Sequence, residues 1–333
     1  MNKLTAGLGA ALVLCVYAVP ANAQATRTWV SGTGNDANAC TRSAPCATFS
    51  TALSKTVAGG EIDCVDAGGF GTFTINKSIT IDCGGAVGSI LANGVTGITV
   101  NAGANDKIVL RNLNIQGLGA GTNGIRFTAG FHLTVDNVTI TGFTSRGIDV
   151  DKGASANVYV RDTRIANVAT GIRLFTGLGG INAQIDNVRI DNASASGLEV
   201  ASGSTIASIS NSVITNATGS GLLMSGGGFI NASRTTIAKS GIGVNSNAPS
   251  GSIRVSAMNL QDNGTGFAVV SGATISSAGN NKVLERSARP RMASRSRSDK
   301  GSSTSSTLCG PGAGIAALAR RARCRYDSAR GAA

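Results

Sequence analysis

A short phrase that begins with glycine recurs along most of the chain at a nearly constant spacing. In each copy the glycine is followed by an aliphatic or aromatic residue, then by any residue, then by an apolar one. The copies begin at Gly97, Gly124, Gly147, Gly171, Gly197, Gly221, Gly241 and Gly266. From Ile98 to Phe267 the seven steps cover 169 residues, or about 24 residues per step. A fixed period of this length is typical of a solenoid, in which each repeat stacks on the next.

Each step contains two further runs in which apolar and polar residues alternate. Leu133 and Val135 belong to one run, and Val138 and Ile140 belong to the next. Alternation with a period of two predicts short strands with one buried face, and three strands per step predict three sheets around one core. We therefore expect an all-β chain folded as a parallel β-helix of nine or ten coils. The fixed Leu and Asn consensus of a leucine-rich repeat is absent, and a β-propeller would need antiparallel hairpins.

One polar residue recurs after the second strand of each step. The positions are Asn112, Asn137, Asp162, Asn187 and Asn211. In a parallel solenoid these residues would stack about 4.8 Å apart, so their side chains could bond along the stack and to turn amides. We interpret this row as a structural ladder rather than a ligand site.

The ends of a solenoid need caps, because an open strand edge invites aggregation. Phe49, Leu53 and Val57 fall on one face of a helix predicted between Pro45 and Val57. We assign residues 24–60 to an N-terminal segment with this cap helix and residues 61–281 to the β-helix. The coils before residue 97 are expected to be less regular.

Residues 1–23 have the features of a signal peptide. Lys3 precedes the apolar run Leu8–Val19, which is too short to span a bilayer, and a small-residue cleavage site ends at Ala23. Cleavage near Ala23 would make the mature protein secreted or periplasmic. No later segment reaches 18 apolar residues, so we expect no transmembrane segment.

The cysteines agree with an oxidising compartment. Loss of Cys15 with the signal peptide leaves an even number, six, which favours disulfides. Proximity along the chain favours the pairs Cys40–Cys46 and Cys64–Cys83, although six cysteines allow fifteen connectivities. Zinc binding is disfavoured, because the chain has only one histidine.

Most of the net charge of +12 belongs to the last part of the chain. Residues 24–281 carry 16 Lys and Arg against 14 Asp and Glu, whereas residues 282–333 carry 12 against 3. The last segment is also rich in Ser and Ala, so we expect a basic, disordered tail. Two explanations stay open: attachment to an anionic polysaccharide or lipid, and a shift of the coding frame near residue 283. Nucleic acid is not an expected partner of an exported chain.

The chain resembles the pectate-lyase-like, right-handed β-helix repeat superfamily, specifically its small secreted bacterial members. The resemblance rests on the stretch Gly34–Cys46, the run Gly59–Ile81 and the glycine-led repeats, and it covers residues 27–281. It implies a right-handed solenoid. It does not imply one reaction, since the superfamily contains lyases, hydrolases, epimerases and non-catalytic adhesins.

Enzymes of this superfamily usually hold their site on the outer face of one sheet, below long loops. The resemblance implies that a lyase would need carboxylates to hold calcium, and that a galacturonase would need opposed carboxylates with a His and an Arg–Lys pair. The sequence has no Asn-Thr-Asp, Asp-Asp or Arg-Ile-Lys string. We therefore expect no cofactor, with calcium needed only by a lyase.

One row of charged residues remains as a candidate site. The middle residue of the glycine-led strand should point outward, which stacks Arg126, Asp149, Arg173 and Glu199 on successive coils with Asp151 beside them. These charges alternate in sign, so the row could be a surface salt ladder of little energetic value. It could instead bind an acidic glycan through Arg126 and Arg173, or cleave one with Asp149, Asp151 or Glu199 as acid or base.

The row leaves the enzyme question open. The first hypothesis is an exported, non-catalytic surface or matrix protein that contacts acidic polysaccharide or a cell-surface glycan. The alternative is a polysaccharide lyase or glycoside hydrolase that acts on uronic-acid glycans. An adhesin-like fibre would need a trimerisation element, and the chain has no coiled-coil heptads. His132 is expected to point outward at the start of a strand, without a Ser or Cys partner.

Overall fold

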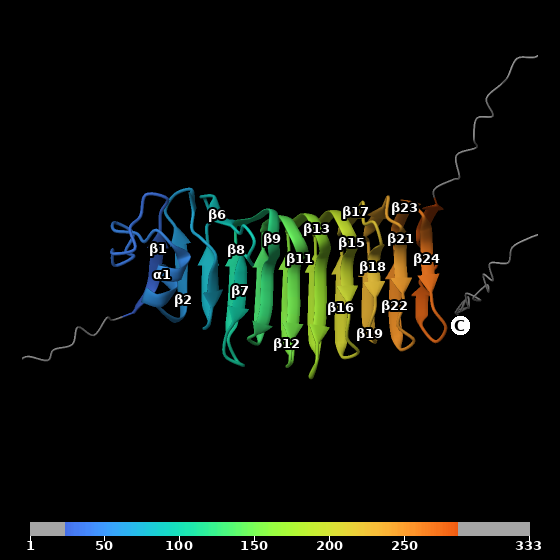
Figure 1. The fold of residues 1–333 in the computed structure, drawn as a ribbon. Coiled ribbons are helices and arrows are strands. Elements are labelled where there is room, and N and C mark those ends of the chain that lie inside the picture. The colour runs from blue at the N-terminus through green and yellow to red at the C-terminus, as the bar shows by residue number, and fades with distance from the viewer. Residues whose placement is uncertain (1–23, 286–333) are drawn as a thin grey trace, which may run out of the picture. The chain divides into compact units, whose positions relative to one another are not determined.

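The structure is a computed structural model that describes residues 24–285 (Figure 1). Its strands are stacked side by side along one axis, from β1 at the N-terminal end to β24 near the C-terminal end. The predicted signal peptide, Cys309, Cys324 and nearly all of the basic tail lie outside the described residues. The all-β solenoid with coils of about 24 residues is confirmed.

The first face of the solenoid is an 11-stranded sheet, all of whose neighbouring strands are parallel. Its strands are β1 (Ala25–Val30), β2 (Thr56–Cys64), β5 (Ile79–Asp82), β8 (Lys107–Arg111), β10 (His132–Asp136), β12 (Ala156–Arg161), β14 (Ile181–Asp186), β16 (Thr205–Ser210), β19 (Gly228–Ser233), β22 (Gly251–Ser256) and β25 (Thr274–Ser277). Consecutive members come from consecutive coils, which is the pairing that the repeat predicts.

A 15-stranded sheet supplies the other two faces, because four long strands turn a corner and belong to both. These are β9 (Leu113–Ala129), β11 (Thr139–Lys152), β13 (Arg164–Thr176) and β15 (Arg189–Val200). The second face adds β3 (Gly68–Gly69), β6 (Gly88–Leu91), β17 (Val213–Thr215), β20 (Thr236–Ala238), β23 (Asn259–Asn263) and β26 (Lys282–Glu285). The third face adds β4 (Phe73–Ile75), β7 (Ile98–Asn101), β18 (Ser220–Met224), β21 (Ile242–Ser246) and β24 (Thr265–Val269). The glycine-led phrases build this third face.

In the seven phrases from Gly97 to Gly241, the glycine is required by the spacing between coils. A Cβ atom on Gly147 would lie 2.7 Å from the carbonyl oxygen of Gly171 and 2.5 Å from Cγ2 of Ile165. A Cβ on Gly171 would meet the carbonyl oxygen of Gly197 at 2.5 Å. Each of these phrases therefore begins where two neighbouring coils approach too closely for any side chain.

The inward side chains form one continuous core. In β14, for example, buried and exposed residues alternate strictly, with Ile181, Ala183 and Ile185 inside. Because every coil stacks its aliphatic residues on those of the next, the outward residues of each face also fall into straight rows. Those rows carry the candidate site.

The N-terminal end is closed by the predicted cap helix, α1 (Phe49–Lys55), which is shorter than expected because Val57 already belongs to β2. The hydroxyl of Thr48 accepts a hydrogen bond from the amide of Thr51 at 3.2 Å, which caps the helix. Phe49 packs its ring 4.9 Å from that of Phe70 and 5.2 Å from that of Phe73. The helix thus covers the first coils with aromatic side chains.

Strand pairing starts before the helix and continues past residue 281. Strand β1 precedes the cap helix and pairs with β2, and β26 pairs with β23. The two predicted disulfides, Cys40–Cys46 and Cys64–Cys83, are present, each with a Cα–Cα distance of 4.7 Å. The second joins strand β2 to the residue that follows β5, so it fastens two neighbouring coils.

Candidate functional site

The charged row on the third face has the register that the repeat predicts. Arg126 pairs with Asp149, Asp149 with Arg173, and Arg173 with Glu199, each on the neighbouring strand. The same row continues with Leu223, which ends the run of charges. Successive coils therefore bring together charged residues that lie 23 to 26 positions apart in the sequence.

Asp149 lies at the centre of this row and is buried, with only 1% of its surface exposed. Its Oδ1 lies 3.1 Å from Nη1 of Arg173, and its Oδ2 lies 3.8 Å from Nε of Arg126. A third guanidinium contacts the same carboxylate, because Nη1 of Arg146 lies 3.4 Å from Oδ2. Three arginine side chains therefore fold over one carboxylate and shield it from water.

Sequence reasoning missed Arg146. It pairs with Asn123 and Thr170 on the neighbouring strands and comes just before Gly147, beyond the corner where the register of β11 shifts. The alternation of inward and outward residues breaks at that corner, so the pattern gives no direction for this side chain. The one sequence signal that pointed to a contact with Asp149 was the position of Arg146, three residues before it.

We name Arg126, Arg146, Asp149, Asp151 and Arg173 the third-face cluster. Asp151 lies 2.9 Å from Nη2 of Arg126 and keeps 30% of its side chain exposed. The cluster contains three arginines and two aspartates, so cations are in excess. Arg126 is 44% exposed and Arg173 is 17% exposed, so the excess charge reaches solvent.

Arg173 is held from two sides. Besides its contact with Asp149, its guanidinium carbon lies 4.9 Å from the centroid of the Phe175 ring, at a distance typical of a cation–π contact. Glu199, on the next coil, bonds elsewhere: its Oε1 accepts a hydrogen bond of 2.7 Å from the hydroxyl of Ser225. Residues 24–285 contain no ion pair between Arg173 and Glu199, so the alternating ladder stops at Arg173.

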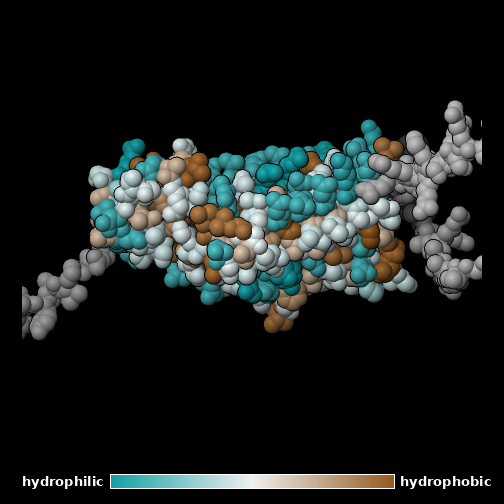
Figure 2. Space-filling model, turned by 45° about the horizontal axis from the view of Figure 1, so that its top comes forward, coloured by the Kyte–Doolittle hydropathy of each residue, from teal (hydrophilic) through white to brown (hydrophobic). Residues whose placement is uncertain are grey.

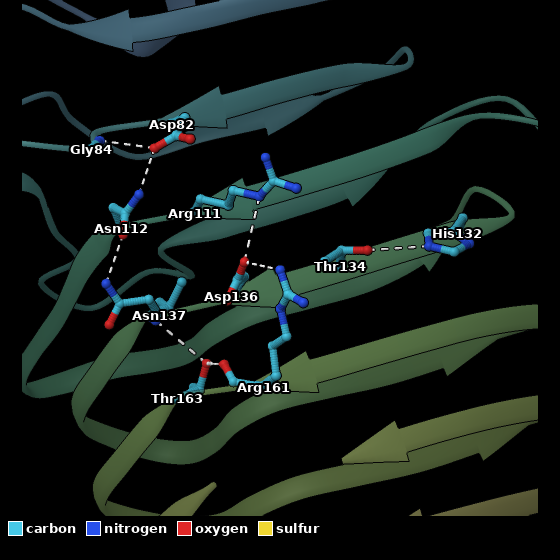
Figure 3. A network of polar contacts seen from close by, with 11 residues as sticks. Asp82, Gly84, Arg111, Asn112, His132, Thr134, Asp136, Asn137, Arg161 and Thr163 are labelled. Atoms are coloured by element: carbon cyan, nitrogen blue, oxygen red, sulfur yellow. Dashed lines mark hydrogen bonds and ion pairs between the residues drawn. The ribbon is translucent and has the colours of Figure 1, made fainter. Parts of the chain in front are cut away.

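A second charged row lies on the first face, and the sequence analysis did not identify it. Asp82, Arg111, Asp136, Arg161 and Asp186 occupy paired positions at the ends of successive strands. Figure 3 shows Asp136 between the two arginines, with Nη2 of Arg161 at 2.6 Å and Nε of Arg111 at 3.5 Å. The hydrogen bond from Arg161 to Asp136 raises the pKa of the Arg161 guanidinium. We name these five residues the first-face row; here acids are in excess, three to two.

The predicted polar ladder follows directly after this row (Figure 3). All five of its residues have a φ between 50° and 56°, the left-handed region that Asn and Asp tolerate best. Nδ2 of Asn137 donates to Oδ1 of Asn112 at 2.7 Å, and Nδ2 of Asn187 donates to Oδ1 of Asp162 at 2.6 Å. The ladder thus turns the chain from the first face to the second and bonds neighbouring coils.

A second ladder of the same kind lies between the second and third faces. Asn167, Asn192 and Asn216 also have φ values between 55° and 57°. Nδ2 of Asn192 donates to Oδ1 of Asn167 at 2.7 Å, and Nδ2 of Asn216 donates to Oδ1 of Asp191 at 2.9 Å. In the sequence its members lie between the strands of the second face and the glycine-led phrases.

His132 lies at the start of β10, and its Nε2 is 3.2 Å from the hydroxyl of Thr134 (Figure 3). Its ring stacks on that of Tyr159 with centroids 4.8 Å apart. Burial, and to a smaller extent the charge of Lys107, lowers the pKa of the imidazole. These contacts fit a ring packed on the outside of the sheet.

Residues 24–285 contain neither a metal-binding group of side chains nor a membrane-spanning helix. No group of three His, Cys, Asp or Glu side chains is placed to hold a metal ion. No helix there is both long and apolar enough to cross a membrane.

The surface in Figure 2 is mainly hydrophilic, with separate hydrophobic patches, the largest toward the N-terminal half of the solenoid.

Comparison with known proteins supports the fold. The chain matches no family model and no curated protein sequence. Among solved structures it is similar to a crystal structure of pectate lyase Pel9A, with a TM-score of 0.55 and 16% sequence identity. The alignment covers 77% of this chain and 78% of that one. At this identity the similarity shows a pectate-lyase-like parallel β-helix, and the chemistry must be argued from the chain's own residues.

Proposed function

We propose that this chain, which has the pectate-lyase-like parallel β-helix fold, is an exported, non-catalytic surface or matrix protein that binds acidic polysaccharide. The third-face cluster is the proposed binding site. The observation that carries the proposal is the excess of guanidinium groups around the buried Asp149. Two disulfides support a location in an oxidising compartment, outside the cell or in the periplasm.

The cluster suits a carboxylate ligand because its arginines are held in place before the ligand arrives. Asp149 contacts Nε of Arg126 and Nη1 of Arg173, and these side chains keep 44% and 17% of their surfaces exposed. A guanidinium has five N–H donors in a planar arrangement, so one edge can bind Asp149 while another binds a uronate. In this proposal Arg126 and Arg173 contact the glycan, and Asp149 is a positioning residue.

Three features favour binding over catalysis. The carboxylate of Asp149 is covered by arginines, so a substrate proton could not reach it in this arrangement. Asp151 is paired with Arg126, and Glu199 accepts a hydrogen bond from Ser225. A glycosidase places two carboxyl groups on opposite sides of the bond that it cleaves, whereas here both aspartates are occupied by arginine contacts.

The test is a calorimetric titration of the full chain with an oligogalacturonate. The variant Arg126→Gln with Arg173→Gln should bind fewer equivalents of the oligosaccharide than the wild type, because both charge-assisted contacts are lost. Arg161→Gln is the matched control, since Arg161 is also an exposed, ion-paired arginine but lies on the first face. Equal binding by the double variant and the wild type would contradict the proposal.

A parallel assay addresses the enzyme alternative. The full chain is incubated with uronic-acid polysaccharides, with and without calcium, and unsaturated products and new reducing ends are measured. We expect no product. Product formation that disappears in Asp151→Asn or Glu199→Gln would make the protein a lyase or hydrolase and would overturn the non-catalytic assignment.

A further inference from the structure

The outer side of the first face contains a hollow of about 550 Å³ near the C-terminal end of the solenoid. It extends over strands β16, β19, β22 and β25, whose side chains line it. None of these strands contributes to the third-face cluster. The hollow is therefore separate from the site proposed above.

The hollow exists because the outward side chains become small along the first face. On β12 and β14 the middle and end positions of the strand hold Tyr159, Arg161, Gln184 and Asp186. The aligned residues on the following strands are mostly serines, and those that line the hollow are Ser208, Ser210, Ser233, Ser256 and Ser276. Replacing long side chains by serine removes the outer layer of the sheet and leaves hydroxyl groups at its base.

Two arginines stand at this hollow. Arg254 is exposed, occupies the same row as Ser208 and Asn231, and lies with its guanidinium carbon 5.5 Å from the centroid of the Phe229 ring. Arg234 is exposed in the turn after β19, where its Nε donates to Oδ1 of Asn211 at 2.8 Å. The thirteen lining residues include both arginines and no Asp or Glu.

Phe229 adds an apolar surface beside the hollow, where its ring contacts Arg254. It is 41% exposed although it is a large hydrophobic residue, and it lies two positions before Asn231 on β19. Hydroxyl groups, an amide, two cations and an aromatic ring together match a ligand that is rich in hydroxyls, carries negative charge and has apolar C–H faces. An acidic sugar has all three properties.

We propose that this hollow is a second glycan-binding site, on a different face from the third-face cluster, and that it takes an acidic oligosaccharide. Arg254 and Arg234 bind carboxylates, Asn231 and the serines bind sugar hydroxyls, and Phe229 packs against a sugar ring. The inference shares its ligand class with the proposed function but uses none of the same residues. The full chain should therefore bind two equivalents of oligosaccharide.

The test is calorimetry of the full chain with hexagalacturonate and with a neutral galactan oligomer of equal length. Arg234→Gln with Arg254→Gln should weaken binding at one of two sites by about tenfold or more, because each change removes a charge-assisted contact. Ser233→Met should weaken the same site without any change of charge, since it fills the hollow. Arg189→Gln, an exposed arginine on the second face, is the control and should bind as the wild type does.

The two proposed sites can fail separately. If Arg234→Gln with Arg254→Gln and Ser233→Met both bind hexagalacturonate within twofold of the wild type, the hollow is not a site. If Arg126→Gln with Arg173→Gln alone abolishes all binding, the hollow is again excluded and the proposed function stands. If the hollow variants abolish all binding, the hollow is the binding site and the third-face cluster is excluded. Equal affinity for the neutral oligomer would overturn the role of the two arginines.

Discussion

The third-face cluster and the first-face row begin from the same pattern of alternating charges on successive coils, yet they differ in burial and in net charge. In the cluster, three arginines surround one carboxylate that is 1% exposed. In the first-face row, the central Asp136 keeps 14% of its side chain exposed and contacts two arginines that are 41% and 56% exposed. Acids are in excess in the row and cations in the cluster.

The difference shows that alternation alone does not decide what a charged row does. Exposed pairs in a row contribute little each, because water and salt screen them. A buried carboxylate with three guanidiniums is strongly coupled, since removing the anion leaves cations without compensation. The extra arginine of the cluster, Arg146, comes from the corner of β11, where the strand register shifts. An irregular position therefore produces the asymmetry between two otherwise similar rows.

The largest expected effect is that of Asp149→Asn. The change leaves three guanidinium groups facing a neutral amide, and we expect a loss of about 3 kcal/mol in the free energy of unfolding, the low end for a broken buried pair because the arginines are partly exposed. Urea unfolding followed by circular dichroism measures it. The matched control is Asp151→Asn, because Asp151 has one arginine partner and a partly exposed carboxylate; this variant should lose less than about 1 kcal/mol. Similar losses for the two variants would contradict the distinct character of the cluster.

The polar ladder beside the first-face row should give the next largest effect. Asn187→Ala removes a hydrogen bond to Asp162 and places alanine, which tolerates the left-handed region less well than asparagine, at a φ of 51°. We therefore expect the free energy of unfolding to fall by about 2 kcal/mol. Asn187→Gly keeps the backbone conformation accessible and should cost about 1 kcal/mol for the lost bond. Thermal unfolding of both variants separates the two contributions. A glycine variant as unstable as the alanine variant would show that backbone conformation is not the cause.

Asp136→Asn should lower the free energy of unfolding by less, about 1 kcal/mol, although Asp136 also lies between two arginines. Both partners are exposed, so water can solvate them after the change. The cost should fall further at high salt, whereas the cost of Asp149→Asn should persist because the carboxylate is shielded. Urea unfolding at low and high sodium chloride measures this difference. A salt-independent cost for Asp136→Asn would place the two rows in the same class.

The sequence was sufficient for the features that depend on the repeat. The spacing of the glycine-led phrases determines the register of Arg126, Asp149, Arg173 and Glu199, because a Cβ at the glycine that begins these phrases would clash with the neighbouring coil. The left-handed turns at the predicted Asn ladder also follow from residue type, because Asn and Asp tolerate a positive φ better than most residues. Periodicity therefore predicts which coil and which face a residue occupies.

The burial of Asp149 could not be predicted in this way. It depends on how three long side chains from different coils bend over one carboxylate, and one of them, Arg146, lies where the alternation breaks. The hollow on the first face was also missed, since it results from several serines on separate strands becoming neighbours only after stacking. Properties that arise from several coils together need the structure.

The smallest expected effect, and the last contrast between the faces, is in the pH dependence of stability. Among side chains, only histidine has an ordinary pKa between pH 5 and 8, and the chain has a single histidine, His132 on the first face. Burial and Lys107 lower its pKa in the folded protein, so below pH 6.5 the unfolded chain binds the proton more readily and stability falls as the solution is acidified. Unfolding midpoints at pH 7.5 and 5.5 should therefore differ less in His132→Gln than in the wild type. An unchanged difference would mean that the ring stacked on Tyr159 is not the source of this pH dependence.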